Sequence, residues 1–177
     1  HALDPALDAL TRTQSFGVYF GRLAREKGVR NILDALAQLD APTLHFVFAG
    51  RGPEEAFLRK RVKELGLEQR VRFIPWLAPH ALAQLVQRAV FAVLPSLEES
   101  FGNSMAEAMA VGVAVIATSA GSIPEIVRHG ETGLLVPPDA SSELATAMRD
   151  LLADPARRRA FGAAGRALVR SRYTWAA

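Results

Sequence analysis

FGVYFGRLAREKG, residues 16–28, joins a continuous apolar run to a basic turn that begins at a glycine. The run 16–20 lacks the apolar–polar alternation of a half-buried strand, which predicts a strand covered on both faces. Similar short apolar runs recur along the chain, and helical stretches follow most of them. This rhythm predicts an α/β fold: a doubly wound, Rossmann-like parallel sheet of about six strands with helices on both faces.

The predicted elements are bounded by glycine, proline and capping residues. We expect strands over residues 16–20, 44–49, 71–74, 90–94, 113–118 and 133–136. We expect helices over residues 31–39, 54–65, 81–87, 104–110, 141–152 and 155–169, the last open to a break at Gly162 and Gly165. A loop is expected through Gly121 to Pro124. Residues 1–14 are expected to be a linker or N-terminal remnant with one helical turn, and residues 15–177 to form one domain.

The composition is that of a globular domain, and it excludes several classes of function. Of the 177 residues, 50% are hydrophobic and 22% charged, so intrinsic disorder is excluded. The chain has no cysteine, which excludes disulfides, a thiol nucleophile, a cysteine zinc site and an iron–sulfur cluster. The four histidines are scattered, and no metal site is expected.

The charge pattern favours a small anionic ligand. The net charge is +3, and the basic residues are spread along the chain rather than clustered, which argues against nucleic acid as a partner. The apolar runs are all shorter than the roughly 20 residues that a membrane-spanning helix needs.

The turn after the first predicted strand is the first candidate site, because parallel sheets bind ligands at the carboxyl ends of their strands. Gly21 lets the backbone approach a ligand closely, Arg22 offers a planar fork for phosphate oxygens, and Lys27 adds a mobile charge. The turn matches neither the dinucleotide fingerprint nor the P-loop pattern. The residues alone do not distinguish an anion-binding turn from a solvated basic turn, and both interpretations are kept.

The loop and helix after the fourth predicted strand form the second candidate site. Gly102 and Asn103 suit a tight turn into a helix whose N–H groups face the strand ends. Glu99 in the loop and Glu107 in the helix are acceptors suited to sugar hydroxyls. Ser104-x-x-Glu107 is also a capping-box pattern, so a purely structural role for Glu107 is equally open. The turns 50–53 and 118–125 also follow strands, but ordinary turn and capping chemistry explains them.

Three motifs occur in one order and at characteristic spacing: Gly21-Arg22-Leu23 with Glu26-Lys27-Gly28, the pair Glu99-x7-Glu107, and the run GETGLLVP at residues 130–137. Together they resemble the C-terminal, donor-binding domain of glycosyltransferase family 4 (group 1), which has the GT-B fold. The resemblance covers residues 15–175. It implies a retaining transferase that uses a nucleotide-diphospho-sugar donor and needs no metal or other cofactor.

The resemblance also implies roles for individual residues. Arg22 and Lys27 correspond to the pair that holds the donor diphosphate and stabilises it as it leaves. Glu99 corresponds to the glutamate beside the donor sugar, and Glu107 to the one that binds the ribose hydroxyls. The other implied donor contacts are Gly21, Phe101, Gly102, Asn103 and Ser104, with Arg72, Phe73 and Ile74 beside the base. No residue is implied as a nucleophile.

The sequence departs from the family pattern at several positions outside these charged residues. Pro75 stands where a glycine is frequent, Ser122 replaces one of two glycines, and Val90 stands where an aspartate is frequent. The runner-up hypotheses are a nucleotide-sugar 2-epimerase, against which the turn at Arg22 and Lys27 argues, and a non-catalytic nucleotide-binding module.

The family enzymes also have an N-terminal domain that binds the acceptor, and no counterpart lies in these 177 residues. We therefore expect this chain to bind the donor weakly and to transfer no sugar. The resemblance suggests a bacterial, cytoplasmic parent enzyme of glycan or cell-envelope polysaccharide synthesis, associated with the inner face of the membrane. The base (UDP or GDP donor), the sugar, the acceptor and the oligomeric state stay open.

Overall fold

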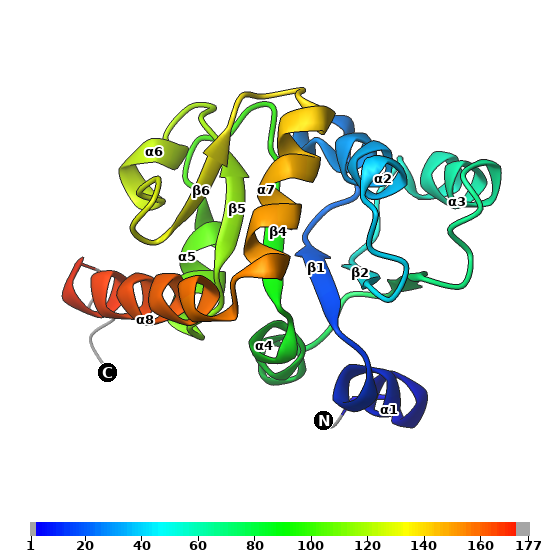
Figure 1. Cartoon of the computed structure of the whole chain (residues 1–177), viewed down its shortest axis with the longest axis horizontal. Helices are drawn as coiled ribbons and strands as arrows, with labels where there is room; N and C mark the ends of the chain where they lie inside the picture. The colour runs from blue at the N-terminus through cyan, green and yellow to red at the C-terminus, as the bar shows by residue number, and fades with distance from the viewer. Residues whose placement is uncertain (1–2, 173–177) are drawn as a thin grey trace.

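A computed structural model describes residues 3–172 of the chain (Figure 1). Within that range the centre is one six-stranded sheet, parallel throughout, with the order β3-β2-β1-β4-β5-β6. Its strands are β1 (Phe16–Phe20), β2 (His45–Ala49), β3 (Val71–Ile74), β4 (Phe91–Leu94), β5 (Val115–Thr118) and β6 (Gly133–Val136). The predicted α/β doubly wound fold is therefore confirmed.

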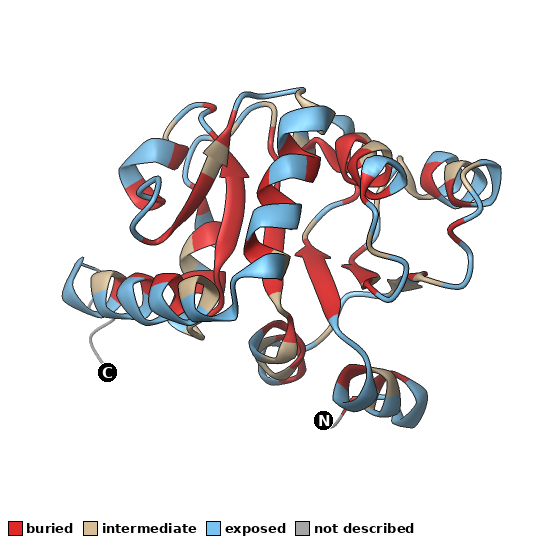
Figure 2. Ribbon diagram, viewed as in Figure 1, coloured by how far each residue is buried: buried red, intermediate tan, exposed pale blue. Residues whose placement is uncertain are grey.

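The strands are short and almost wholly buried, which explains why the sequence shows no alternation in them. Every residue of β1, β4 and β5 is buried, and Figure 2 shows the sheet as the buried centre of the molecule. Three strands have the predicted bounds, and the other three begin one or two residues later than predicted. Before β5 the reason is visible: Val113 and Ala114 are buried but precede the paired residues.

Helices cover both faces of the sheet. The helical segments are α1 (Pro5–Thr13), the 3-10 turn η1 (Arg25–Lys27), α2 (Val29–Gln38), α3 (Glu55–Glu64), α4 (Pro79–Arg88), α5 (Asn103–Ala110), α6 (Ile123–Ile126), α7 (Ser141–Ala153) and α8 (Pro155–Arg172). Right-handed crossovers place α2 and α3 on one face and α4, α5 and α6 on the other. Helix α7 packs beside α2, and α8 packs against α5 (Figure 1).

The N-terminal segment forms more than the single helical turn that was expected. Helix α1 has nine residues, and the carboxylate of Asp4 caps it by accepting from the backbone N–H of Ala6 at 3.0 Å. Leu7 is buried, and Asp8 pairs with Arg88 of α4 at 2.6 Å. The segment therefore packs against the domain. Residues 1–2 and 173–177, which belong to the predicted segments 1–14 and 15–177, lie outside the described residues.

The break expected in the last helix does not occur, because its two glycines are packing positions. A Cβ at Gly162 would collide with the carbonyl oxygen of Gly112, and one at Gly165 would lie 3.3 Å from Met109. The glycines let α8 approach α5 and the turn that follows it. The loop expected through residues 121–124 is also partly wrong, since the short helix α6 begins at Ile123. No helix among residues 3–172 is long and apolar enough to cross a membrane.

Candidate functional site

Two loops meet at the carboxyl edge of the sheet, where the strand order reverses between β1 and β4. The loop after β1 runs from Gly21 to Gly28, and the backbone N–H of Leu97, in the loop after β4, donates to the carbonyl of Glu26 at 2.8 Å. Gly28 has φ +67°, and a Cβ there would collide with the carbonyl oxygen of Pro95. A glycine is therefore required at this point for the two loops to touch.

The ion pair between Lys27 and Glu99 joins the two loops, with 3.2 Å between Nζ and Oε2. Glu99 also accepts from the hydroxyl of Ser96 at 3.3 Å, from the backbone N–H of Gly102 at 3.2 Å and from that of Phe101 at 3.4 Å. The carboxylate thus accepts from the two backbone N–H groups that immediately precede α5.

The environment of Glu99 keeps it ionised. Burial by itself would raise the pKa of Glu99, but the backbone N–H of Gly102, the ammonium of Lys27 and the N–H of Phe101 together outweigh it. The pKa of this carboxyl group therefore lies below its ordinary value.

Arg22 stands at the rim of the same turn. Its side chain is 64% exposed, and its guanidinium pairs with Glu26 at 3.3 Å. An exposed pair of this kind contributes little stability, so the guanidinium is free to turn to an anionic ligand. Below it, the buried hydroxyl of Tyr19 donates to the backbone carbonyl of Arg22 at 2.6 Å and fixes the turn. Burial, with the nearby charges of Glu26 and Glu99, raises the pKa of Tyr19, so this hydroxyl stays protonated.

Glu107 is not part of a capping box. Helix α5 begins at Asn103 with Gly102 as its N-cap, so Ser104 lies inside the helix and caps nothing. Within residues 3–172 the carboxylate of Glu107 has no hydrogen-bond or ion-pair partner, and desolvation by its surroundings raises its pKa. The structural alternative that the sequence left open is thereby excluded, and the carboxylate is available to a ligand.

Two cavities flank Glu107. One, of about 360 Å³, lies between α4 and α5 and is lined by Phe20, Trp76 and Leu77, among others. The other, of about 530 Å³, is lined by Phe101 and Asn103 at the start of α5. Arg22, Lys27 and Glu99 line neither cavity. The predicted sugar-contacting loop and the predicted ribose acceptor Glu107 therefore line the second cavity together. The first cavity is lined by Phe20, the residue before Gly21, where the charged turn begins.

The residues predicted beside the base do not line either cavity at Glu107. The ring of Phe73 stacks on Phe48 with centroids 5.1 Å apart, and the guanidinium of Arg59 in α3 lies 4.8 Å from its centroid. Phe73 therefore packs toward α3, on the face of the sheet opposite α4 and α5. Arg72 and Ile74 are likewise absent from the two cavities.

Trp76 is a residue that the sequence reasoning missed. It follows β3 closely, its side chain is 61% exposed, and it lines the cavity that Glu107 borders. An exposed tryptophan after the carboxyl end of a strand is a signal that could have found it. Among the other predicted contacts, the backbone N–H of Gly21 donates to the carbonyl of Ala49 at 3.0 Å. Ser104, in the first turn of α5, is half-buried. The described residues include no group of three or more acidic or histidine side chains able to hold a metal ion.

Comparison with known proteins gives one family. The model of the family "Glycosyl transferases group 1" matches residues 9–168. Among curated proteins, the alpha-maltose-1-phosphate synthase of Mycolicibacterium smegmatis is 35% identical over 170 residues, which is 89% of this chain and 44% of that protein. The chain thus spans less than half the length of this relative.

Solved structures agree. Anabaena Alr3699/HepE in complex with UDP-glucose superposes with a TM-score of 0.87 at 28% identity, covering 97% of this chain and 50% of that one. The C-terminal domain of a group 1 family glycosyl transferase, LpcC from Francisella tularensis, gives a TM-score of 0.82 at 28% identity and covers 98% of this chain and 95% of that one. Since the family model spans most of the sequence, the chain belongs to the glycosyl transferases of group 1.

Proposed function

We propose that this chain is the donor-binding domain of a retaining glycosyltransferase of family 4, which moves a sugar from a nucleotide-diphospho-sugar to an acceptor. One observation carries the proposal. The basic turn with Arg22 and Lys27 meets the Glu99 loop at the reversal point of the sheet, next to a cavity bordered by the unpartnered Glu107. Cations, an anion-accepting helix start and a free carboxylate acceptor are what a nucleoside diphosphate requires.

The charged turn is the proposed diphosphate site. Arg22 is held by an exposed pair with Glu26, and Lys27 by a partly buried pair with Glu99. A diphosphate carries more negative charge than either carboxylate, so it can draw both cations toward itself. The same cations would stabilise the charge that develops on the diphosphate as the sugar leaves, which makes them the proposed catalytic residues together with Glu99 beside the sugar.

The cavity beside Glu107 is the proposed nucleoside site. A carboxylate without a protein partner is suited to accept from the two ribose hydroxyls. The lining by Trp76, Leu77 and Phe20 is apolar and partly aromatic, as stacking of a base requires. We therefore propose that the base lies against Trp76 rather than beside residues 72–74. A structural neighbour that was solved with UDP-glucose makes UDP the first nucleotide to test, with GDP the alternative.

The rest of the reaction is proposed to need a partner domain. The chain covers 44% of the alpha-maltose-1-phosphate synthase that it resembles. Sugar transfer needs a cleft that excludes water, which a second domain would complete. We propose an N-terminal domain that binds the acceptor and closes over the donor. The parent enzyme would work in the cytoplasm, at the inner face of the membrane, in glycan or cell-envelope polysaccharide synthesis. The donor is the substrate, and no metal takes part.

Calorimetric titration with UDP, GDP, ADP and NAD tests the proposal. We expect one nucleoside diphosphate to bind selectively to the wild-type chain and to bind more weakly, by about tenfold or more, to Arg22→Ala, because a charge-assisted phosphate contact contributes about 1.5–3 kcal/mol. Arg25→Ala is the matched control, since Arg25 is an exposed arginine of the same turn with no proposed ligand contact. Selective binding of NAD, or equal affinities in wild type and Arg22→Ala, would overturn the proposal.

A further inference from the structure

Helix α8 is a strongly basic element far from the proposed diphosphate site. It contains six arginines and no acidic residue between Pro155 and Arg172. Two of the arginines have a structural role: the guanidinium of Arg157 lies 5.1 Å from the ring centroid of Phe161, and Arg158 donates to the carbonyls at the end of α7. The others need a separate explanation.

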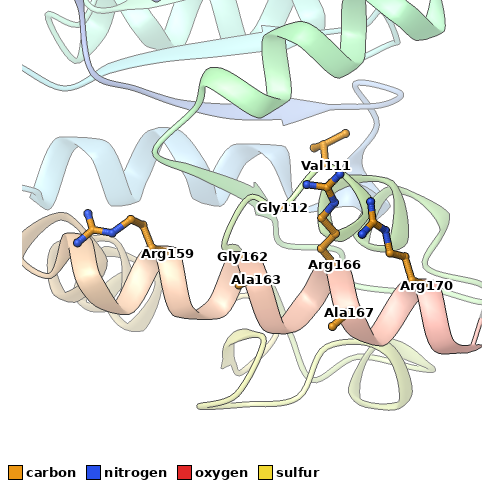
Figure 3. Close-up of a pocket in the computed structure, with 8 residues that line it drawn as sticks. All are labelled: Val111, Gly112, Arg159, Gly162, Ala163, Arg166, Ala167 and Arg170. Atoms are coloured by element: carbon orange, nitrogen blue, oxygen red, sulfur yellow. The ribbon is translucent and has the colours of Figure 1, made fainter.

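Arg166 and Arg170 are like charges four residues apart on the same helix face. Figure 3 shows both side chains extending from α8 toward Val111, the residue that follows α5. Within residues 3–172 neither has an ion-pair or hydrogen-bond partner. Like charges at this spacing destabilise a helix about as much as an opposite pair stabilises it. Arg166 and Arg170 thus repel each other, and no carboxylate among residues 3–172 pairs with either of them.

A cavity of about 400 Å³ lies under these side chains. Arg159, Arg166 and Arg170 line it together with Val111, Gly112 and Gly162 (Figure 3). Its floor is made by residues with little or no side chain, and the aliphatic part of Arg166 lies 3.8 Å from where a Cβ of Gly112 would be. The cationic ends of Arg166 and Arg170 therefore stand beside an open space whose lining supplies no competing carboxylate, while that of Arg159 extends away from them (Figure 3).

The cavity is distinct from the charged turn proposed to bind the diphosphate, although Val111 lines both this cavity and the proposed nucleoside cavity. Helix α5 begins at Asn103, beside the proposed diphosphate site, and ends at Ala110, whereas the cavity lies beyond its end at Val111 and Gly112. Eight helical residues rise about 12 Å, and the turn at Gly112 leads to the amino end of β5. The arginines therefore lie near the amino end of β5, at the far end of α5 from the proposed diphosphate site.

We propose that Arg166 and Arg170 form a second anion site, which binds a phosphate group, in the cavity that Arg159 also lines. Arginine presents a planar fork of N–H donors that matches phosphate oxygens in geometry and charge. An anion placed between Arg166 and Arg170 converts their mutual repulsion into two attractions. The size of the cavity suits a phosphate carried by a small molecule or by a phospholipid headgroup, and both sources share this chemistry.

Thermal unfolding with inorganic phosphate tests the site. We expect phosphate to raise the Tm of the wild-type chain and of Arg22→Ala, in which the donor turn is weakened. The double variant Arg166→Gln/Arg170→Gln should lose the rise, with phosphate affinity lower by about tenfold or more. This variant should fold, because it removes a repulsion and both substituted residues are exposed. Arg172→Gln, on the same helix but outside the cavity lining, should keep the rise.

The outcomes separate this site from the donor site. A rise in Tm that disappears in Arg22→Ala but persists in the double variant would overturn the second site, as would an equal loss in Arg172→Gln or no rise at all. Co-sedimentation with vesicles distinguishes the sources of the phosphate. A headgroup source predicts binding to vesicles of anionic phospholipid and not to neutral ones, lost in the double variant. A soluble source predicts the rise in Tm without vesicle binding.

Discussion

Glu99 supplies negative charge beside the start of α5. Its carboxylate accepts from the backbone N–H of Gly102 and of Phe101 while pairing with Lys27. Helix starts stabilise negative charge, and here the protein supplies that charge itself. A donor that binds beside Lys27 must share this cation with Glu99. Lys27 therefore couples donor binding to the stability of the loop after β4.

The lowered pKa of Glu99 predicts a pH-dependent contribution to stability. Because the folded-state pKa lies below the unfolded value of about 4.5, the unfolded chain binds the proton more tightly. The contribution is fully present above the unfolded pKa and is lost as the pH falls through the folded pKa. Glu99→Gln should reduce the free energy of unfolding by about 1 kcal/mol at pH 7 and by less at pH 3, measured by urea denaturation. An equal loss at both pH values would contradict this account.

The pKa of Glu107 shifts upward, which predicts that removing its charge changes stability and nucleotide binding in opposite directions. Desolvation raises its pKa, so folding makes the ionised form less favourable than it is in the unfolded chain. Glu107→Gln should therefore increase the free energy of unfolding slightly at pH 7 while it weakens nucleotide binding. Denaturation and calorimetry on the same sample test both effects, with Glu68→Gln as an exposed control. A variant that is less stable and binds as wild type would contradict the proposed role.

Trp76 offers a test of where the base lies. The side chain is 61% exposed, so Trp76→Ala should leave the fold intact. Stacking on an aromatic ring contributes about 1–3 kcal/mol per base, which predicts about tenfold weaker nucleotide binding. Phe57→Ala removes another exposed aromatic residue, on α3, and should bind as wild type. Unchanged affinity in Trp76→Ala would return the base to the residues of β3.

The difference between Trp76 and the charged candidates shows what the sequence reveals at the scale of single residues. Lys27 and Glu99 could be chosen because each follows an apolar run and belongs to a spaced motif. The family resemblance places Phe73 beside the base, through main-chain contacts, while its side chain packs on Phe48 and toward α3. Which way a strand residue faces depends on the packing of the sheet, which the sequence of one short strand does not determine.

At the scale of elements, α8 shows a limit of propensity. Glycine inside a helix costs about 1 kcal/mol relative to alanine, which favours a break at Gly162 and Gly165. The helix continues because Gly162 lies against the backbone of Gly112, a contact that no local pattern reveals. The strands were easier to predict, since a fully buried parallel strand reads as a short unbroken apolar run.

The same contact predicts opposite outcomes for two glycines of one helix. Gly162→Ala should lower the free energy of unfolding by about 1–3 kcal/mol, because the new Cβ collides with the rigid carbonyl of Gly112. Gly165→Ala meets only the flexible side chain of Met109 at 3.3 Å, so the gain in helix propensity should leave stability unchanged or higher. Urea denaturation of both variants gives the comparison. Equal losses would show that the helix is not packed as described.

At the scale of the whole molecule, the site is a product of strand order. Residues 27 and 99 are 72 positions apart in sequence, and they pair because β1 and β4 are neighbours at the reversal point of the sheet. The alternation of strands and helices was enough to place both residues at the carboxyl edge of the sheet, where ligands of such sheets bind, but it did not predict their contact. The arginine-lined cavity beyond α5 could not be expected in this way, since it depends on how α8 crosses the turn at Gly112.

The most direct test of the central claim is a titration of the isotope-labelled chain with UDP, followed by the chemical shifts of its backbone amides. The account predicts that the shifted amides belong to residues 21–28, to residues 99–107 and to Trp76 and Leu77, and that Lys27→Met weakens the titration. Shifts confined to other parts of the sheet, or a titration that Lys27→Met leaves unchanged, would contradict it.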